Sequence, residues 1–504
     1  MKRSIELQMA AVAAVVLFAF AISGMAQQSA PGSPRGVSGT VQSVPVRGPS
    51  SPGTLFIPKS SVAQPPQPGK LAAHTNVQIY VPAGQTPDSL PPFPGYAYET
   101  PQSLECVYGL TSNGSNFPNC NPNNGSLNTA TAGSQSIAIV DAYDDPSAPG
   151  DLAWFSIQFG IPISVGQFQV VWANTINSSC NYGGVPIDYS GGWEVEESLD
   201  IEWAHAMAPG AKMYLVEACS NYNSDLQQAV LVATNLVQCG NSEINPSTLA
   251  LGSCPSTGGI GEVSMSWGEG EFSGETGTSC GSVGIYQNPM NDGCFNKYAV
   301  VYVASSGDSP GVSYPCASPN VVCAGGTTNR RSATTANWIQ ETAWVDGGGG
   351  STALEPLPSY QSGLTNCTAL GSTRCVPDLS FDSDPYTGVY VYDTFPVEGF
   401  YYYEWLIVGG TSVAAPALAG VMNNASSTTN TWAGSSSVEL SQIYYNRFNS
   451  AAFTDITVGY CGFYMGLSTL SHWDPCTGVG VPNGFSGLNF TSYTTAAGAG
   501  VIKP

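Results

Sequence analysis

The stretch SIAIVDAY (136–143), followed closely by PGDLAWFSIQFG (149–160), decides the fold class. The first is a short apolar run typical of a strand buried on both faces, and the second has the length and composition of a helix. Similar strand candidates recur at 168–173, 212–218, 262–267 and 298–306, with helix candidates at 193–208 and 224–237 between them. This alternation predicts an α/β domain with a mostly parallel sheet covered by helices on both faces.

The composition limits what such a domain binds. The chain has 504 residues, of which 42% are hydrophobic, so a large core is expected. It carries 35 acidic against 13 basic residues, a net charge of −22. A surface of this sign repels nucleic acid and anionic membranes, so neither is an expected partner. It also suits acid, where protonation removes charge, although an ordinary acidic exported protein would have the same balance.

The chain divides into three segments. Residues 1–26 have a basic start, an apolar run at 9–23 and a small-residue exit, as in a secretory signal peptide. An anchoring helix is the alternative, but this run falls short of the ~20 residues that span a membrane. Residues 27–98 are rich in Pro, Ser and Gly and are interpreted as a linker or short pro-region. Residues 99–504 form the main domain, and we expect it to be secreted and monomeric.

Cysteine usage agrees with export. The 14 cysteines include six near pairs: Cys106/Cys120, Cys239/Cys254, Cys280/Cys294, Cys316/Cys323, Cys367/Cys375 and Cys461/Cys476. In an exported chain these predict disulfides that staple loops, with neighbour pairing as a hypothesis. The absence of CxxC and the scarcity of histidine argue against a zinc site.

The stretch VGGTSVAAPALAG (408–420) places Ser412 at the entrance of a small-residue helix, as a hydroxyl nucleophile would be presented. The chain has only three histidines to activate it. His74 lies in the linker-like segment and His472 in a C-terminal loop. His205 belongs to the helix 193–208. A Ser-His-Asp triad is therefore poorly supported.

Carboxylates are better placed than histidines. Glu196 and Asp200 lie one helical turn apart, where two carboxyl groups can share a proton. Glu197, three residues before Asp200, is also compatible with the helical geometry, and a solvated acidic face is the simpler interpretation. His205 points about 180° away from Glu196. Asp308 lies in the glycine-flanked turn SSGDSPG (305–311), at the carboxyl end of a strand.

Together these motifs resemble the sedolisin family of serine-carboxyl peptidases, from about residue 100 to the C-terminus. The resemblance keeps the family's order and spacing through IAIVDAYDDPSAPGDLAWFSIQFGIP, EESLD with IEWAHAMAPGAK, SMSWG, SSGDS and GGTSVAAP. It implies a subtilisin-like fold and endo- or exopeptidase activity in acid on protein or peptide substrates. By the same match, Ser412 is the nucleophile, Glu196 the general base, Asp200 its partner and Asp308 the oxyanion-hole acid.

The implied chemistry is consistent with acid. A carboxylate can act as a base at low pH, where histidine is already protonated. Asp308 must be protonated to donate a hydrogen bond to the oxyanion. The family pattern favours Glu196 over Glu197, because it has a glutamate four residues before the aspartate. It also implies that Ser266, Trp267 and Gly268 of SMSWG bind the substrate backbone as an added strand.

A calcium ion is the cofactor that the resemblance implies. FTDITVG (453–459) and HWDPCTGVGVP (472–482) resemble the family's C-terminal calcium loop, with oxygen ligands from Asp455, Ile456 and Asp474. Leu470 and His472 stand where the family has glycines, so the loop loses backbone freedom. A loop held by a Cys461–Cys476 disulfide without metal is the alternative.

Two further departures concern activity. The serine follows Gly409 and Gly410 where the family has Ser-Gly, and the segment 27–98 is shorter than the family's folded prodomain. Self-cleavage is therefore left open. The leading hypothesis is a secreted, acid-acting serine-carboxyl endopeptidase. A catalytically silent extracellular binding or adhesion protein on the same fold is the alternative.

Overall fold

The structure is a computed structural model. It describes residues 53–64, 71–86, 89–93, 98–110, 118–124, 133–174, 178–181, 183–239, 259–280, 290–398, 404–462 and 467–488. They all belong to one compact unit, residues 42–504. The predicted signal peptide, 1–26, lies outside the described residues.

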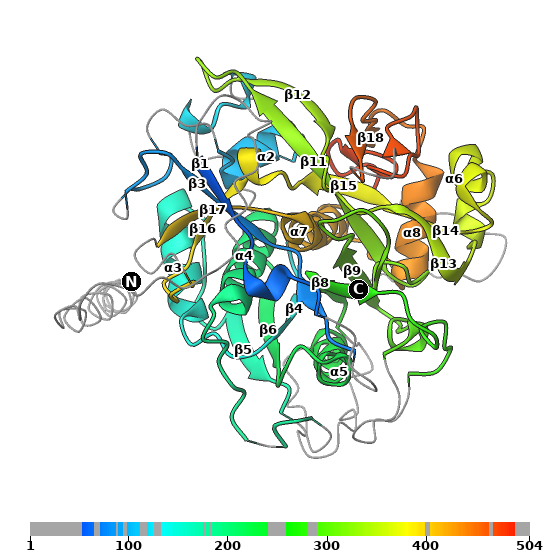
Figure 1. The fold of residues 1–504 in the computed structure, drawn as a ribbon, viewed down its shortest axis with the longest axis horizontal. Coiled ribbons are helices and arrows are strands. Elements are labelled where there is room, and N and C mark those ends of the chain that lie inside the picture. Colours follow the sequence, from blue (N-terminus) through cyan, green and yellow to red (C-terminus); the bar gives the residue numbers. More distant parts are fainter. Residues whose placement is uncertain are drawn as a thin grey trace, which may run out of the picture. The chain divides into compact units, whose positions relative to one another are not determined.

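A large, mostly parallel sheet forms the centre of the domain (Figure 1). Its strands run in the order β12 (Trp338–Ala343), β11 (Val322–Arg331), β9 (Val300–Ser305), β7 (Gly261–Met265), β4 (Ser136–Ala142), β6 (Lys212–Ala218) and β5 (Phe168–Trp172). The strand β15 (Leu379–Asp382) also pairs with β11 in parallel, and only β12 is antiparallel to its neighbour. The chain leaves β4 towards β5 and later crosses to β7 on the other side. Ligands bind at such a switch point, beyond the carboxyl ends of the strands.

Helices cover both faces of this sheet. The helices α3 (Ala148–Phe159), α4 (Gly192–Met207), α7 (Thr411–Thr429) and α8 (Ser436–Tyr445) share one core with alternate strand residues such as Ile137. The helix α5 (Asn223–Cys239) shares the second core with the intervening residues, such as Ala138. Successive side chains of a strand point to opposite faces, so these continuous apolar runs need cover on both sides. The predicted subtilisin-like α/β fold class is confirmed, as are the strand and helix candidates named above, except that the candidate 262–267 is divided between β7 and a second strand that begins at Trp267.

The segment predicted to be a linker or pro-region contributes strands to the domain. The strands β1 (Gly53–Phe56) and β3 (Gln78–Pro82) join β17 (Trp405–Gly409) and β16 (Val389–Tyr392) in an antiparallel sheet of order β1-β3-β17-β16. In Figure 1 the blue β1 and β3 lie beside the yellow β16 and β17. The short β2 (His74–Thr75) pairs with β8 (Trp267–Gly270), which also pairs with β10 (Ser313–Tyr314).

Smaller elements complete the described residues. The helix α2 (Pro101–Val107) is capped by Thr100, whose side chain forms a capping box with Ser103. The helix α6 (Thr365–Leu370) lies near the pair β13 (Gly350–Pro356) and β14 (Thr373–Val376). Two short pairs lie near the C-terminus, β18 (Phe453–Thr454) with β21 (Val481–Pro482) and β19 (Tyr460–Cys461) with β20 (Leu467–Ser468).

Disulfides staple the loops, as predicted. Five of the predicted neighbour pairs are bonded: Cys106–Cys120, Cys280–Cys294, Cys316–Cys323, Cys367–Cys375 and Cys461–Cys476. A further bond joins Cys180 to Cys219, the two cysteines that neighbour pairing left over. The predicted Cys239–Cys254 pair involves a residue outside the described ones. Among the described residues, no helix combines the length and hydrophobicity needed to cross a membrane.

Candidate active site

Ser412 lies in the first turn of α7 and is buried. Gly410, two residues before Ser412, has φ 109°, a conformation that residues with a Cβ rarely adopt. The turn at Gly410 connects β17 to α7. Pro416 lies four residues after Ser412 and has no N–H to donate to the Ser412 carbonyl. That carbonyl instead lies 3.3 Å from the Ser266 hydroxyl. Because Pro416 cannot donate, the Ser412 carbonyl remains available to accept a hydrogen bond from Ser266.

Ser266, in the break between β7 and β8, connects Ser412 to Asp200. Its hydroxyl lies 2.8 Å from Oδ1 of Asp200, and its carbonyl accepts a hydrogen bond of 3.1 Å from the Ser412 hydroxyl. The Ser412 hydroxyl proton must therefore turn away from this carbonyl before it can pass to a carboxylate. Ser266, predicted to bind substrate, thus also positions two of the predicted catalytic side chains.

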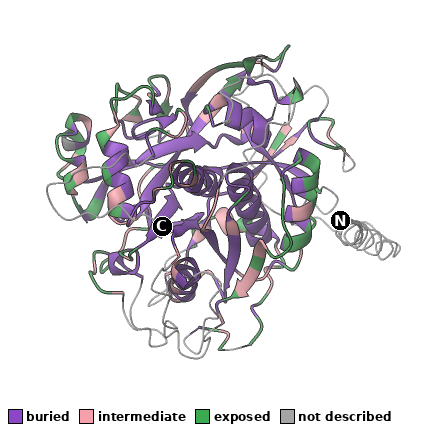
Figure 2. Cartoon of the chain, turned by 180° about the vertical axis from the view of Figure 1, so that it is seen from behind, coloured by how far each residue is buried: buried purple, intermediate pink, exposed green. Residues whose placement is uncertain are grey.

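Glu196 and Asp200 lie on α4, which is buried along its whole length (Figure 2). Burial, with the neighbouring Asp200 and Asp141, holds the pKa of Glu196 well above its usual range, and the Ser412 hydroxyl partly opposes this rise. Burial and Asp141 likewise raise the pKa of Asp200. The structure therefore brings Ser412, Glu196 and Asp200 together in a site with little water, where the two carboxyl groups titrate as a pair.

Asp141 was not singled out from the sequence. It lies near the carboxyl end of β4, and burial raises its pKa to about 8. Neither of its carboxyl oxygens has a hydrogen-bond partner among the described residues. An ionisable residue within an otherwise apolar, doubly buried strand is unusual. The aspartate within the apolar run SIAIVDAY was therefore the sequence signal that could have identified Asp141.

The other two ionisable candidates on α4, Glu197 and His205, have neighbours other than Ser412. Burial raises the pKa of Glu197, and its largest charged influences are Glu217 and Asp145 rather than Ser412. His205 is buried, its pKa is lowered to about 4 by desolvation, and its ring nitrogens have no partner among the described residues. The geometry therefore favours Glu196 over Glu197 and gives His205 a packing role.

Asp308 follows β9 and meets the start of α7. Its Oδ1 accepts hydrogen bonds from the backbone N–H of Thr411 at 2.7 Å and from the Thr411 hydroxyl at 3.0 Å. Its Oδ2 accepts a longer one, 3.4 Å, from the Gln78 side chain. Burial raises the pKa of Asp308 to about 7, although these donors oppose the rise. At acid pH Asp308 is thus protonated and can donate through Oδ2.

The three residues of SMSWG with a predicted role in substrate binding all lie along β8 or at its start. The Trp267 ring is buried, and its Nε1 donates to the Val140 carbonyl at 2.7 Å, so only the backbone of Trp267 can meet a peptide. The edge of β8 is occupied by the chain's own strand β2, with His74 opposite Gly268. Sequence reasoning missed this contact.

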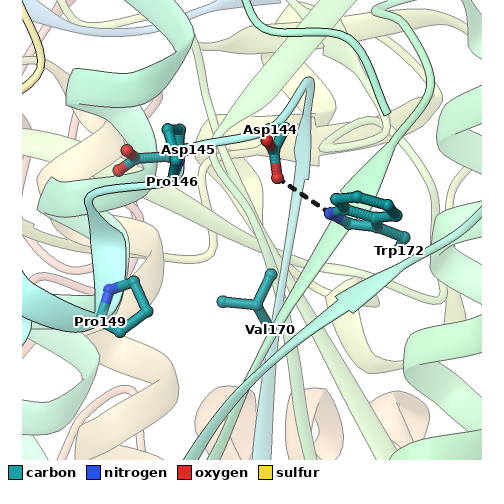
Figure 3. Close-up of a pocket in the computed structure, with 6 residues that line it drawn as sticks. All are labelled: Asp144, Asp145, Pro146, Pro149, Val170 and Trp172. Carbon is teal, nitrogen blue, oxygen red and sulfur yellow. Dashed lines mark hydrogen bonds between the residues drawn. The ribbon is translucent and has the colours of Figure 1, made fainter. Parts of the chain in front are cut away.

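The pocket drawn in Figure 3 lies at a separate place, where β4 leads into α3. It has a volume of about 460 Å³, and the Trp172 indole N–H donates to Asp144 at 2.9 Å across its wall. It is lined by Asp144, Asp145, Pro146, Pro149, Val170 and Trp172. None of the predicted site residues lines it.

Three curated proteins are similar to the chain. Kumamolisin of Bacillus sp. (strain MN-32) is 29% identical over 376 residues, which cover 69% of this chain and 58% of that protein. Sedolisin of Pseudomonas sp. (strain 101) is 26% identical over 266 residues, 49% of this chain and 40% of that protein. Xanthomonalisin of Xanthomonas sp. (strain T-22) is 30% identical over 188 residues, 34% and 21% of the two chains. These similarities support membership of the sedolisin family.

A solved structure supports the fold of this chain. Pseudomonas sedolisin, a serine-carboxyl proteinase complexed with two molecules of pseudo-iodotyrostatin, superposes with a TM-score of 0.55 at 22% identity, covering 77% of this chain and 95% of that one. No protein-family model matches the chain. The matches span less than two thirds of the length of each curated relative.

The residues predicted to bind calcium only partly fit a cation. Asp455 Oδ1 is buried and has no hydrogen-bond partner among the described residues, which is compatible with a cation ligand, while its Oδ2 accepts from the His472 N–H at 2.8 Å. His472 has φ 68°, so it takes the left-handed conformation expected of the glycine it replaces. The Asp474 carboxylate, however, already accepts hydrogen bonds from Cys476 and Thr477 of its own loop. Ile456 is buried nearby in sequence.

Proposed function

We propose that the chain is a secreted serine-carboxyl endopeptidase that hydrolyses protein or peptide substrates in acid. The observation that carries this proposal is the position of Ser412. It lies at the start of a buried helix, beside the carboxyl pair of Glu196 and Asp200, and the hydrogen bonds of its side chain among the described residues involve no histidine. The similarity to sedolisin-family peptidases supports peptidase activity, and the disulfide-stapled loops support export.

In the proposed mechanism, Ser412 attacks the peptide carbonyl and Glu196 takes its proton, later returning it to the leaving nitrogen. Asp200 retains the proton that the pair shares and keeps Glu196 in position. Asp308, protonated in acid, donates to the oxyanion together with the Ser412 N–H. The low-pH limit of activity is then set by the first proton loss from the pair, and the high-pH limit by ionisation of Asp308.

Calcium is proposed as a structural ion rather than a reactant. Asp455 and Asp474 would supply carboxylate oxygens and Ile456 a backbone carbonyl, and water would complete the set. Its chemistry at this loop is to hold two chain segments together. No residue of the loop takes part in the proposed proton transfers.

The decisive experiment compares the parent with Ser412→Ala on a denatured protein substrate at about pH 3.5 and about pH 7. Hydrolysis by the parent in acid, lost in the variant, is the expected result. Equal activity of the two proteins, or activity of the parent near neutrality only, contradicts the mechanism. A folded parent that hydrolyses nothing at either pH would instead be a binding protein on this fold.

A further inference from the structure

The chain holds one of its own segments, residues 73–78, as an extended peptide across the candidate site. On one side β2 pairs antiparallel with β8, and the Asn76 N–H donates to the Ser266 carbonyl at 3.3 Å. On the other side Ala73 exchanges two hydrogen bonds with Asn221, of 2.9 and 2.7 Å. Backbone pairing along both edges is how extended peptides are recognised, with pockets left for individual side chains.

One peptide carbonyl of this segment is presented to the nucleophile. The Asn76 carbonyl accepts a hydrogen bond of 3.2 Å from the Ser412 N–H. It lies 2.0 Å from the point where a Cβ on Gly410 would stand, and the Asp308 Oδ2 lies 2.6 Å from that same point. Both oxygens thus face one small volume that only glycine leaves open. The bond in register with Ser412 is therefore Asn76–Val77.

The Asn76 side chain is buried and is hydrogen-bonded through its Nδ2, while its Oδ1 has no partner among the described residues. Only 1% of Asn76 is exposed, and its Nδ2 lies 2.7 Å from the Ser305 hydroxyl, at the carboxyl end of β9. The next residue, Ser306, is buried with a hydroxyl that has no partner among the described residues. A side chain here that cannot form hydrogen bonds would leave the Ser305 hydroxyl unpaired, which is unfavourable in a buried site.

We propose that Asn76 occupies the pocket for the residue preceding the scissile bond, and that the enzyme prefers substrates with asparagine there. Ser305 is the residue that determines this preference. The Asn76–Val77 bond is then a substrate within the chain itself. This inference rests on the proposed peptidase function and specifies its substrate class.

Cleavage of the Asn76–Val77 bond is an ordinary peptide hydrolysis. The Ser412 Oγ adds to the Asn76 carbonyl carbon and gives its proton to Glu196. The bond to the Val77 nitrogen breaks as that nitrogen receives the proton. Water then hydrolyses the ester, leaving a carboxyl group on Asn76, a free amino group on Val77 and the serine restored.

The test uses the octapeptide AAHTNVQI, which copies residues 72–79, and versions with Leu or Asp in place of its Asn. Leucine matches asparagine in size but forms no hydrogen bond. For the acid-treated enzyme we expect kcat/KM for the Asn peptide to exceed that for the Leu peptide on the order of tenfold, with mass spectrometry locating the cut after Asn. An equal or faster Leu peptide overturns the proposal.

Two matched variants assign the preference to one hydroxyl. Ser305→Ala should lower the Asn-to-Leu ratio of kcat/KM to near one, whereas Ser306→Ala should keep the parent's ratio. Because the comparison is a ratio within each protein, a partial loss of folded enzyme does not affect it. An unchanged ratio in Ser305→Ala, or an equal fall in both variants, overturns the role of Ser305.

Self-cleavage gives an independent measurement. After incubation in acid, N-terminal sequencing of the parent should find a new chain beginning at Val77, and Ser412→Ala should keep the bond intact. A parent that hydrolyses a denatured protein in acid but cuts this segment elsewhere, or not at all, overturns the inference and leaves the proposed function standing. A parent that hydrolyses neither protein nor peptides overturns both.

Discussion

Glu196 and Glu197 are adjacent on one helix, and their chemistry should differ because they face different neighbours. Glu196 lies beside Ser412, whereas Glu197 faces Glu217 and Asp145. Glu196→Gln removes the proposed base, so we expect kcat/KM in acid to fall roughly 100- to 10,000-fold. Glu197→Gln is the matched control and should stay within about tenfold of the parent. The reverse order would identify Glu197 as the base.

Asp308 should set the upper pH limit of activity. Its pKa is raised to about 7, and only its protonated form donates to an oxyanion. Asp308→Asn carries an amide donor at every pH, so activity should persist above the pH at which the parent loses it. The negative charge of Asp346 helps to raise that pKa, so Asp346→Asn should move the limit to lower pH. Profiles of kcat/KM against pH that do not change in either variant would remove Asp308 from the mechanism.

At the scale of elements, the central strands and helices could be predicted because each carries its signal locally. The runs at β4, β6 and β9 are mostly apolar, as burial on two faces requires. The strand β3 could not be predicted in the same way. Its partner β17 lies more than 300 residues away, with Ile407 opposite Tyr80, and long-range pairing leaves no trace in neighbouring residues.

The residues of the candidate active site also divide into those with a local sequence signal and those without one. Ser412, Glu196, Asp200 and Asp308 each belong to a short motif whose spacing could be compared with a family. Asn76 belongs to no such motif, and although Ser305 opens SSGDS, its contact with Asn76 joins residues 229 positions apart. Only the folded chain shows that β2 fills the edge of β8. The sequence therefore predicted the catalytic residues but did not predict that the segment 73–78 lies across them.

The loop that contains Asp455 and Asp474 makes a prediction about metal. If calcium binds the buried Asp455 Oδ1, added calcium should raise the melting temperature by a few degrees and a chelator should lower it. Asp455→Asn should abolish the calcium-dependent part of that shift. Thermal unfolding of both proteins with calcium or chelator measures it. Identical melting temperatures in all four samples would show a loop held by the Cys461–Cys476 disulfide without metal.

The whole molecule buries many carboxyl groups, and this should make it most stable in acid. Burial raises the pKa of Glu194 to about 9, of Glu262 to about 8 and of Glu341 to about 7. In an unfolded chain these groups titrate near pH 4, so between pH 4 and 9 the native state binds more protons than the unfolded state. The free energy of unfolding should therefore be greatest below about pH 4 and fall as pH rises through these native values.

Glu262 isolates one contribution to this pH dependence. It is fully buried away from Ser412, and its carboxylate accepts a hydrogen bond of 2.8 Å from Asn423. Glu262→Gln keeps an acceptor for Asn423 but has no proton to lose. Denaturant unfolding should show similar stability of parent and variant at about pH 4. At about pH 8 the variant should be more stable by a few kcal/mol, since each pKa unit of difference is worth about 1.4 kcal/mol. A parent that gains stability from pH 4 to pH 8, in parallel with the variant, would show that the buried carboxyl groups do not make this fold an acid-adapted one.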